Sequence, residues 1–205
     1  MEPRQGLIKR AIWLERITVA WMLLEAGVAI ASGLIADSIT LIAFGADSVI
    51  ELLSACLLLW RLRVELRQGE EFSEATERIA ARIGATLLIA LALYVMATAA
   101  WSFWSQQGQE FSALGLVLAV IAIPMMYALA KSKRRVADAI GSAALRADAA
   151  EATACLYLSG VVVLGLLAQW AVGAWWIDGV SALALTPFLL REAREAWEGQ
   201  DEVER

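Results

Sequence analysis

Long apolar stretches separated by short polar connections run along almost the whole chain. A helix needs about 20 mostly apolar residues to cross the hydrocarbon core of a bilayer. Backbone that faces lipid must satisfy its own hydrogen bonds, which a helix does, and no alternating strand pattern occurs in the sequence. The pattern therefore predicts an all-α integral membrane protein with six transmembrane helices, over residues 17–36, 38–60, 83–103, 111–130, 147–171 and 174–190.

Positive charge alternates from one connection to the next. All 17 Lys and Arg residues fall before the first predicted span, in the second and fourth connections, or after the last span. Cytoplasmic segments of membrane proteins are enriched in Lys and Arg, so both termini are expected in the cytoplasm. The chain then divides into a cytoplasmic N-terminal segment (1–16), a six-helix transmembrane domain (17–190) and a short cytoplasmic tail (191–205).

The composition narrows the class of protein. Hydrophobic residues make up 60% of the chain, against about 45–50% in soluble domains. The net charge of −5 gives no basic surface for nucleic acid, and the chain contains no His, the commonest metal ligand. The sequence has neither a nucleophile elbow nor a phosphate loop, so we expect a protein that is not an enzyme. The first apolar stretch is interrupted by Glu25 and continues to Ile35, unlike a cleaved signal, which indicates a retained span in a multi-pass protein of the inner (plasma) membrane.

Acidic residues at membrane depth are the most informative feature of the sequence. Asp47 and Glu51 lie four residues apart within the second predicted span, so both carboxylates project from one face of the helix. A charged residue at the centre of a span costs about 2.5–3.5 kcal/mol on insertion scales, and such residues are functional by default.

The fifth predicted span repeats this arrangement. Asp148, Glu151 and Cys155 follow one another at intervals of three and four residues, again on one helix face. If the two spans face each other, Asp47, Glu51, Glu151 and Cys155 could supply four ligands to one divalent cation. Buried acids repel one another, so a dication would stabilise them, and deprotonation on binding would link metal to proton movement.

Other interpretations of these residues remain open at this level. Asp47 and Glu51 could be protonated core residues or could pair with Arg146, and Asp148 could be a solvated residue at the helix end. A lone buried Cys is usually a small apolar side chain, so either Cys155 or Asp148 could be the fourth ligand. Glu25, within the first span, is a candidate gating or proton-handling acid with no obvious partner.

The segment Asp47-Ser-Val-Ile-Glu51 resembles the paired-ligand motif in span two of the cation diffusion facilitator family, the divalent-metal/proton antiporters. In span five, Glu151 takes the family's usual His position and Cys155 its usual Asp position. The run from Trp176 to Leu183 also resembles the start of the family's sixth span. The resemblance implies one tetrahedral metal site in the middle of the membrane.

The resemblance also implies the function. We expect a homodimer, a short member without the family's C-terminal cytoplasmic domain, that exports a divalent cation across the lipid bilayer in exchange for protons. Carboxylate and thiol ligands suit Zn²⁺, and Mn²⁺, Fe²⁺ and Cd²⁺ are also compatible. No prosthetic group is expected. Gly84, Ala85 and Ala92 offer a small-residue dimer surface on span three. The alternative is a metal-binding or regulatory membrane protein that keeps the fold but does not transport.

Overall fold

The computed structural model describes residues 2–68, 74–105 and 110–198, and it is all-helical in these ranges. This confirms the predicted all-α class. Most of the helices extend well beyond the predicted spans. Their bounds are α1 Glu2–Ala36, α2 Ile39–Gln68, α3 Glu74–Ser105, α4 Ala113–Ile140, α5 Ala143–Val172 and α6 Ile177–Glu198.

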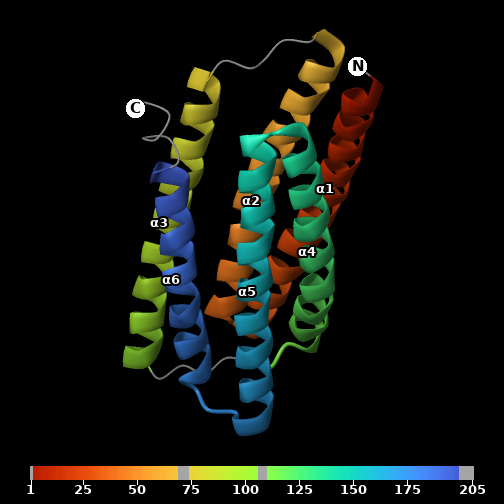
Figure 1. Ribbon diagram of the computed structural model, residues 1–205. Coiled ribbons are helices and arrows are strands. Elements are labelled where there is room, and N and C mark those ends of the chain that lie inside the picture. The colour runs from red at the N-terminus through yellow and green to blue at the C-terminus, as the bar shows by residue number, and fades with distance from the viewer. Residues whose placement is uncertain (1, 69–73, 106–109, 199–205) are drawn as a thin grey trace.

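The helices alternate in direction along the bundle, so that α1 begins and α6 ends at the same end of the molecule (Figure 1). The closest pairs are α1 with α2, α4 with α5, and α3 with α6. Helix α2 also contacts α3, α5 and α6, which makes it the most widely connected helix of the bundle. The acids of α2 are thus placed where several helices meet.

Five of the helices, α1 to α5, are long and apolar enough to cross a membrane. Helix α6 runs alongside α3 within the same bundle (Figure 1) but does not meet this criterion, because its apolar stretch is confined between Asp178 and Arg191. Among the described residues, five helices are therefore candidate membrane spans, as expected for a multi-pass membrane protein.

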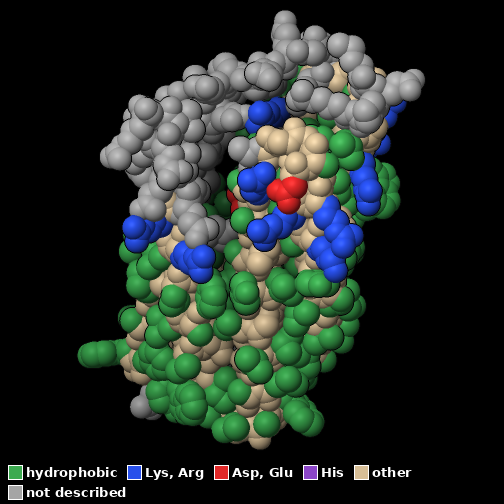
Figure 2. Space-filling view, viewed as in Figure 1, with side chains coloured by type: hydrophobic (Ala, Val, Ile, Leu, Met, Phe, Trp, Pro, Cys, Tyr) green, Lys and Arg blue, Asp and Glu red, His purple; other side chains and the backbone are tan. Residues whose placement is uncertain are grey.

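Charged side chains gather toward one end of the bundle, and the rest of the visible surface is largely hydrophobic (Figure 2). We call this the basic end; its exposed residues include Lys9, Arg10, Arg63, Arg134, Arg135 and Arg191. Trp101, Trp104 and Trp170 are exposed near the opposite end, on α3 and α5. Tryptophan prefers the membrane–water interface, so this surface has the layout of a membrane-embedded bundle.

Glycines bring α1 and α2 into backbone contact. A Cβ atom added to Gly33 would lie 2.8 Å from the Ile42 backbone nitrogen, and one added to Gly45 would lie 2.9 Å from that of Ile30. Real Cβ atoms do not approach so closely, so only glycine fits at either position. Small residues of this kind allow helices to pack tightly in lipid, and here they fix α2 against α1 next to the acidic residues.

A carboxylate from α6 caps the start of α2. Asp178 accepts hydrogen bonds from the Ser38 hydroxyl at 2.8 Å and from the backbone N–H groups of Ile39 and Thr40 at 2.6 and 3.2 Å. The first N–H groups of a helix have no partner within the helix, and the helix dipole favours negative charge there. Asp178 thus fastens α6 to the turn between α1 and α2.

One detail of the expected dimer surface is wrong. Ala92 is fully buried within the protomer, so it is not available to a second chain. The side-chain surroundings of Gly84 and Ala85 lie outside what the structure describes. A sequence pattern of small residues identifies close helix packing without showing whether the neighbour is in the same chain.

Candidate cation site

The acids of α2 face the interior of the bundle. Asp47 is 1% exposed and Glu51 is 7% exposed. Neither carboxylate oxygen of Asp47 has a hydrogen-bond partner within the described residues. Leaving a buried polar group unsatisfied costs about 1–3 kcal/mol, and more when the group is charged. The arrangement at Asp47 is therefore one that a bound cation or a proton would stabilise.

Helix α5 brings its own acid to the same region. Helices α2 and α5 pack against each other, and the carboxyl groups of Asp47 and Glu151 are close enough to interact electrostatically. Asp47 has a further electrostatic neighbour in Glu25 of α1. The structure thus places acids from α1, α2 and α5 around one part of the bundle interior.

Cys155 lies beside Glu25. Its side chain is fully buried, and its Sγ atom is 3.6 Å from Glu25 Oε1. Cys56, which lies off the acidic face of α2, is exposed. The one cysteine that belongs to the acidic region is therefore Cys155.

Glu25 is held by three donors that the sequence did not identify. It accepts hydrogen bonds from Trp21 Nε1 at 2.6 Å and from Ser48 Oγ at 2.8 Å, in addition to the Cys155 contact. Trp21 is one helical turn before Glu25, a spacing at which side chains meet, so this partner could have been found from the sequence. Ser48 and Cys155 are brought to Glu25 only by the packing of α2 and α5.

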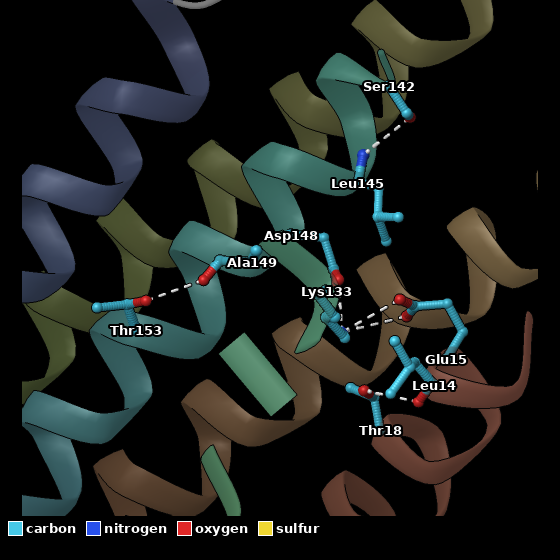
Figure 3. Close-up of polar contacts among 9 residues, drawn as sticks. All are labelled: Leu14, Glu15, Thr18, Lys133, Ser142, Leu145, Asp148, Ala149 and Thr153. Atoms are coloured by element: carbon cyan, nitrogen blue, oxygen red, sulfur yellow. Dashed lines mark hydrogen bonds and ion pairs between the residues drawn. The ribbon is translucent and has the colours of Figure 1, made fainter. Parts of the chain in front are cut away.

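Asp148 has a different environment from Glu151. It forms an ion pair with Lys133 of α4, and the same ammonium group lies 3.2 Å from Oε1 and 3.3 Å from Oε2 of Glu15 in α1 (Figure 3). Lys133 and Glu15 are both 0% exposed. We call Glu15, Lys133 and Asp148 the buried triad. The interpretation of Asp148 as a solvated helix-end residue is wrong, because the side chain is buried and paired.

The assignment of Lys133 to a polar connection is also wrong. Helix α4 continues past residue 130 to Ile140, and Lys133 points into the bundle from this extension. A buried ammonium group is stable only when it is paired, and Glu15 and Asp148 provide that pairing. Nothing in the local sequence Lys131-Ser-Lys-Arg-Arg135 distinguishes this lysine from its exposed neighbours.

Arg146 does not neutralise the acids of α2. It lies on the surface and pairs with Asp138 at 3.1 Å, with both side chains 58% exposed. An exposed pair of this kind contributes little to stability. The alternative in which Arg146 partners Asp47 and Glu51 is not the arrangement in the structure.

The acidic side chains lie near one another, but they are not arranged as a complete set of metal ligands. Within the described residues, no group of three or more Cys, Asp or Glu side chains is close enough together to hold a metal ion. Metal ligation by Asp47, Glu51, Glu151, Cys155 or Asp148 would need the helices or side chains to draw together around the ion.

A multi-pass helical membrane protein with buried acids on several helices has the construction of a membrane transporter for cations. The transmembrane domain of the cation efflux family matches residues 16–198, nearly the whole chain. The chain therefore belongs to the cation efflux family, whose members transport divalent metal cations and are not enzymes. No curated protein matches the chain.

Proposed function

We propose that this protein exports a divalent metal cation from the cytoplasm in exchange for protons. The observation that supports this most directly is Asp47, a fully buried carboxylate with no hydrogen-bond partner in the described structure, with Glu151 of α5 as an electrostatic neighbour. Within a cation efflux domain, such a carboxylate is suited to receive a cation as it passes through the bundle.

The proposed ligands are Asp47 and Glu51 from α2 and Glu151 and Cys155 from α5. Asp148, which was an alternative fourth ligand, is engaged by Lys133 in this structure, and this favours Cys155. Three carboxylates and one thiol suit Zn²⁺, whose usual ligands are N, S and O atoms. Mn²⁺, Fe²⁺ and Cd²⁺ remain candidate substrates, since oxygen ligands favour the first two and sulfur favours the last.

The proposed cycle uses the same acids for metal and for protons. The cation binds to deprotonated carboxylates while the site is open to the basic end, which we assign to the cytoplasm. The helix bundle then rocks to expose the site to the other side, as in alternating access. Protons from outside neutralise Asp47 and Glu151 and release the ion. We further propose that α6 completes six spans and that the transporter works as a homodimer in the inner membrane.

Flux measured in proteoliposomes tests this function. Purified protein is reconstituted, a pH gradient is imposed, and uptake of Zn²⁺, Mn²⁺, Fe²⁺ and Cd²⁺ is followed with internal indicators. We expect metal to cross the membrane in the direction opposite to the proton flow. We expect the Asp47→Asn substitution to abolish this metal movement. A matched control is Asp37→Asn, because Asp37 is an exposed acid in the turn after α1.

The non-transporting alternative predicts a different result in the same experiment. In that case the protein would bind metal, with binding lost in Asp47→Asn, while no ion crossed the membrane under any gradient. The feature that motivates this alternative is the altered pair in span five, where Glu151 and Cys155 stand at the positions that the family usually fills with His and Asp. Flux that is unaffected by Asp47→Asn would place the ion path elsewhere and contradict the proposed site.

A further inference from the structure

We propose that Lys133 is a positioning residue for cation transport: its ammonium group keeps the carboxylates of Glu15 and Asp148 away from the passing ion, so that the ion binds at Asp47 and Glu151. This inference rests on the proposed function. It assigns a specificity role to a residue outside the ligand set.

The buried triad joins three helices at one point. Lys133 comes from α4, Glu15 from α1 and Asp148 from α5, and Figure 3 shows the lysine between the two acids. Glu15 and Lys133 are 0% exposed and Asp148 is 7% exposed. Water is therefore largely excluded, and the lysine provides the positive charge that the two acids need.

The triad is adjacent to the proposed cation site. Asp148 and Glu151 are three residues apart on α5, a rise of about 4.5 Å along the helix axis. Glu151 interacts electrostatically with Asp148, Lys133 and Asp47. A cation near Glu151 is thus within range of the Lys133 charge, and Asp148 would compete for that cation if it were not already paired.

The positive charge of Lys133 balances the negative charges of Glu15 and Asp148. Without the ammonium group, Glu15 and Asp148 would be two buried carboxylates with no cation between them, an arrangement that is strongly unfavourable. A divalent cation with oxygen ligands would relieve it. The ammonium group of Lys133 therefore occupies a position where a metal ion would otherwise bind. Unlike a metal ion, it is part of the chain and cannot dissociate.

Metal stoichiometry of Lys133→Gln tests the inference. We expect Mn²⁺ bound per chain, measured on purified protein in detergent, to rise from about one to about two, since two carboxylates are released for an oxygen-preferring ion. Lys133→Arg, which keeps the charge, should restore the wild-type value. Lys131→Gln makes the same charge change at an exposed lysine on the same helix and should leave the stoichiometry unchanged.

The inference requires that the second Mn²⁺ ion is bound by the two acids of the buried triad. Asp148→Asn placed in the Lys133→Gln protein should remove the second ion and leave the first. If Lys133→Gln is folded and still binds the wild-type number of ions, the inference is overturned. A merely structural lysine would lower stability in Lys133→Gln without adding an ion.

A second variant tests the inference if Lys133→Gln does not fold. Asp148→Asn alone leaves Lys133 paired with Glu15, and we expect its Mn²⁺ affinity to change less than about threefold, because Asp148 is outside the coordination sphere. A loss of tenfold or more would overturn the inference. Failure of the proposed function is distinguishable, since wild-type protein would then move no metal in proteoliposomes, whatever the number of ions that Lys133→Gln binds.

Discussion

Glu25 of α1 and Cys155 of α5 are 130 residues apart in sequence, and in the structure the cysteine Sγ lies 3.6 Å from the glutamate Oε1. The thiol is in position to donate to the carboxylate, which also accepts from Trp21 and Ser48. The contact joins the first helix of the bundle to the helix that carries two of the proposed ligands.

Removing this thiol should change metal preference more than stability. Cys155→Ala leaves Glu25 with its two stronger donors, so the free energy of unfolding should fall by no more than about 1–2 kcal/mol. If Cys155 is a ligand, affinity for Cd²⁺ should fall at least about tenfold more than affinity for Mn²⁺, because sulfur favours the softer ion. Isothermal titration of both ions checks this, with Cys56→Ala as the control. An unchanged Cd²⁺/Mn²⁺ preference would make Cys155 a packing residue.

Asp47→Asn should abolish metal binding without destabilising the metal-free protein. The wild-type carboxylate is buried with no hydrogen-bond partner among the described residues, so a neutral amide of the same shape is easier to bury. We expect the melting temperature of the metal-free variant in detergent to equal or exceed that of the wild type. Asp47→Ala should also lose binding. Wild-type affinity in either variant would place the ion elsewhere.

Asp178→Ala should destabilise the bundle. The substitution leaves the Ser38 hydroxyl and the N–H groups of Ile39 and Thr40 without their acceptor in a buried position. Loss of a cap and of hydrogen bonds to a charged group should cost about 2–3 kcal/mol. Unfolding of the detergent-solubilised protein by increasing SDS measures the loss. Asp178→Asn, which keeps one acceptor oxygen, should retain part of the stability.

Gly45→Ala should separate α1 from α2. The added methyl group would meet the Ile30 backbone nitrogen at 2.9 Å, and overpacking of this kind costs about 1–3 kcal/mol. Gly27→Ala is the matched control on α1, because nothing lies within 4 Å of its added Cβ and alanine favours a helix. The same SDS unfolding assay should show Gly27→Ala to be at least as stable as the wild type. Equal stability of the two variants would contradict the close helix contact.

Both termini should be in the cytoplasm. The exposed Lys and Arg side chains gather at the end where α1 begins and α6 ends (Figures 1 and 2), and cytoplasmic surfaces are enriched in these residues. A protease added to intact spheroplasts should therefore spare a tag at either terminus and remove it only after the membrane is broken. Removal of a C-terminal tag from outside would show that α6 does not cross the membrane in the proposed direction.

The sequence was sufficient to predict the helical class and the approximate position of each helix, because lipid exposure demands long apolar runs. It also predicted that Asp47 and Glu51 share a buried face of α2. It could not predict the buried triad. Lys133 occurs in a run of basic residues, and its burial depends on Glu15 and Asp148, which reach it only after α1, α4 and α5 have packed.

The role of Asp178 was missed for the same reason. An acid in the first turn of a helix is normally read as favouring that helix's own start. Here its carboxylate stabilises α2, 138 to 140 residues earlier in the chain. Contacts between helices distant in sequence are set by the tertiary packing, and a single sequence carries no record of them.

The cap at Asp178 connects two parts of the bundle at one end only. It joins α6 to the start of α2 at the end opposite the basic end, through three hydrogen bonds to one buried carboxylate. Separating the α3–α6 pair from the other helices at this end would break those bonds, whereas tilting the pair open at the basic end would leave them intact. This contact therefore ties α6 to α2 at one end of the bundle and places no restraint on the basic end.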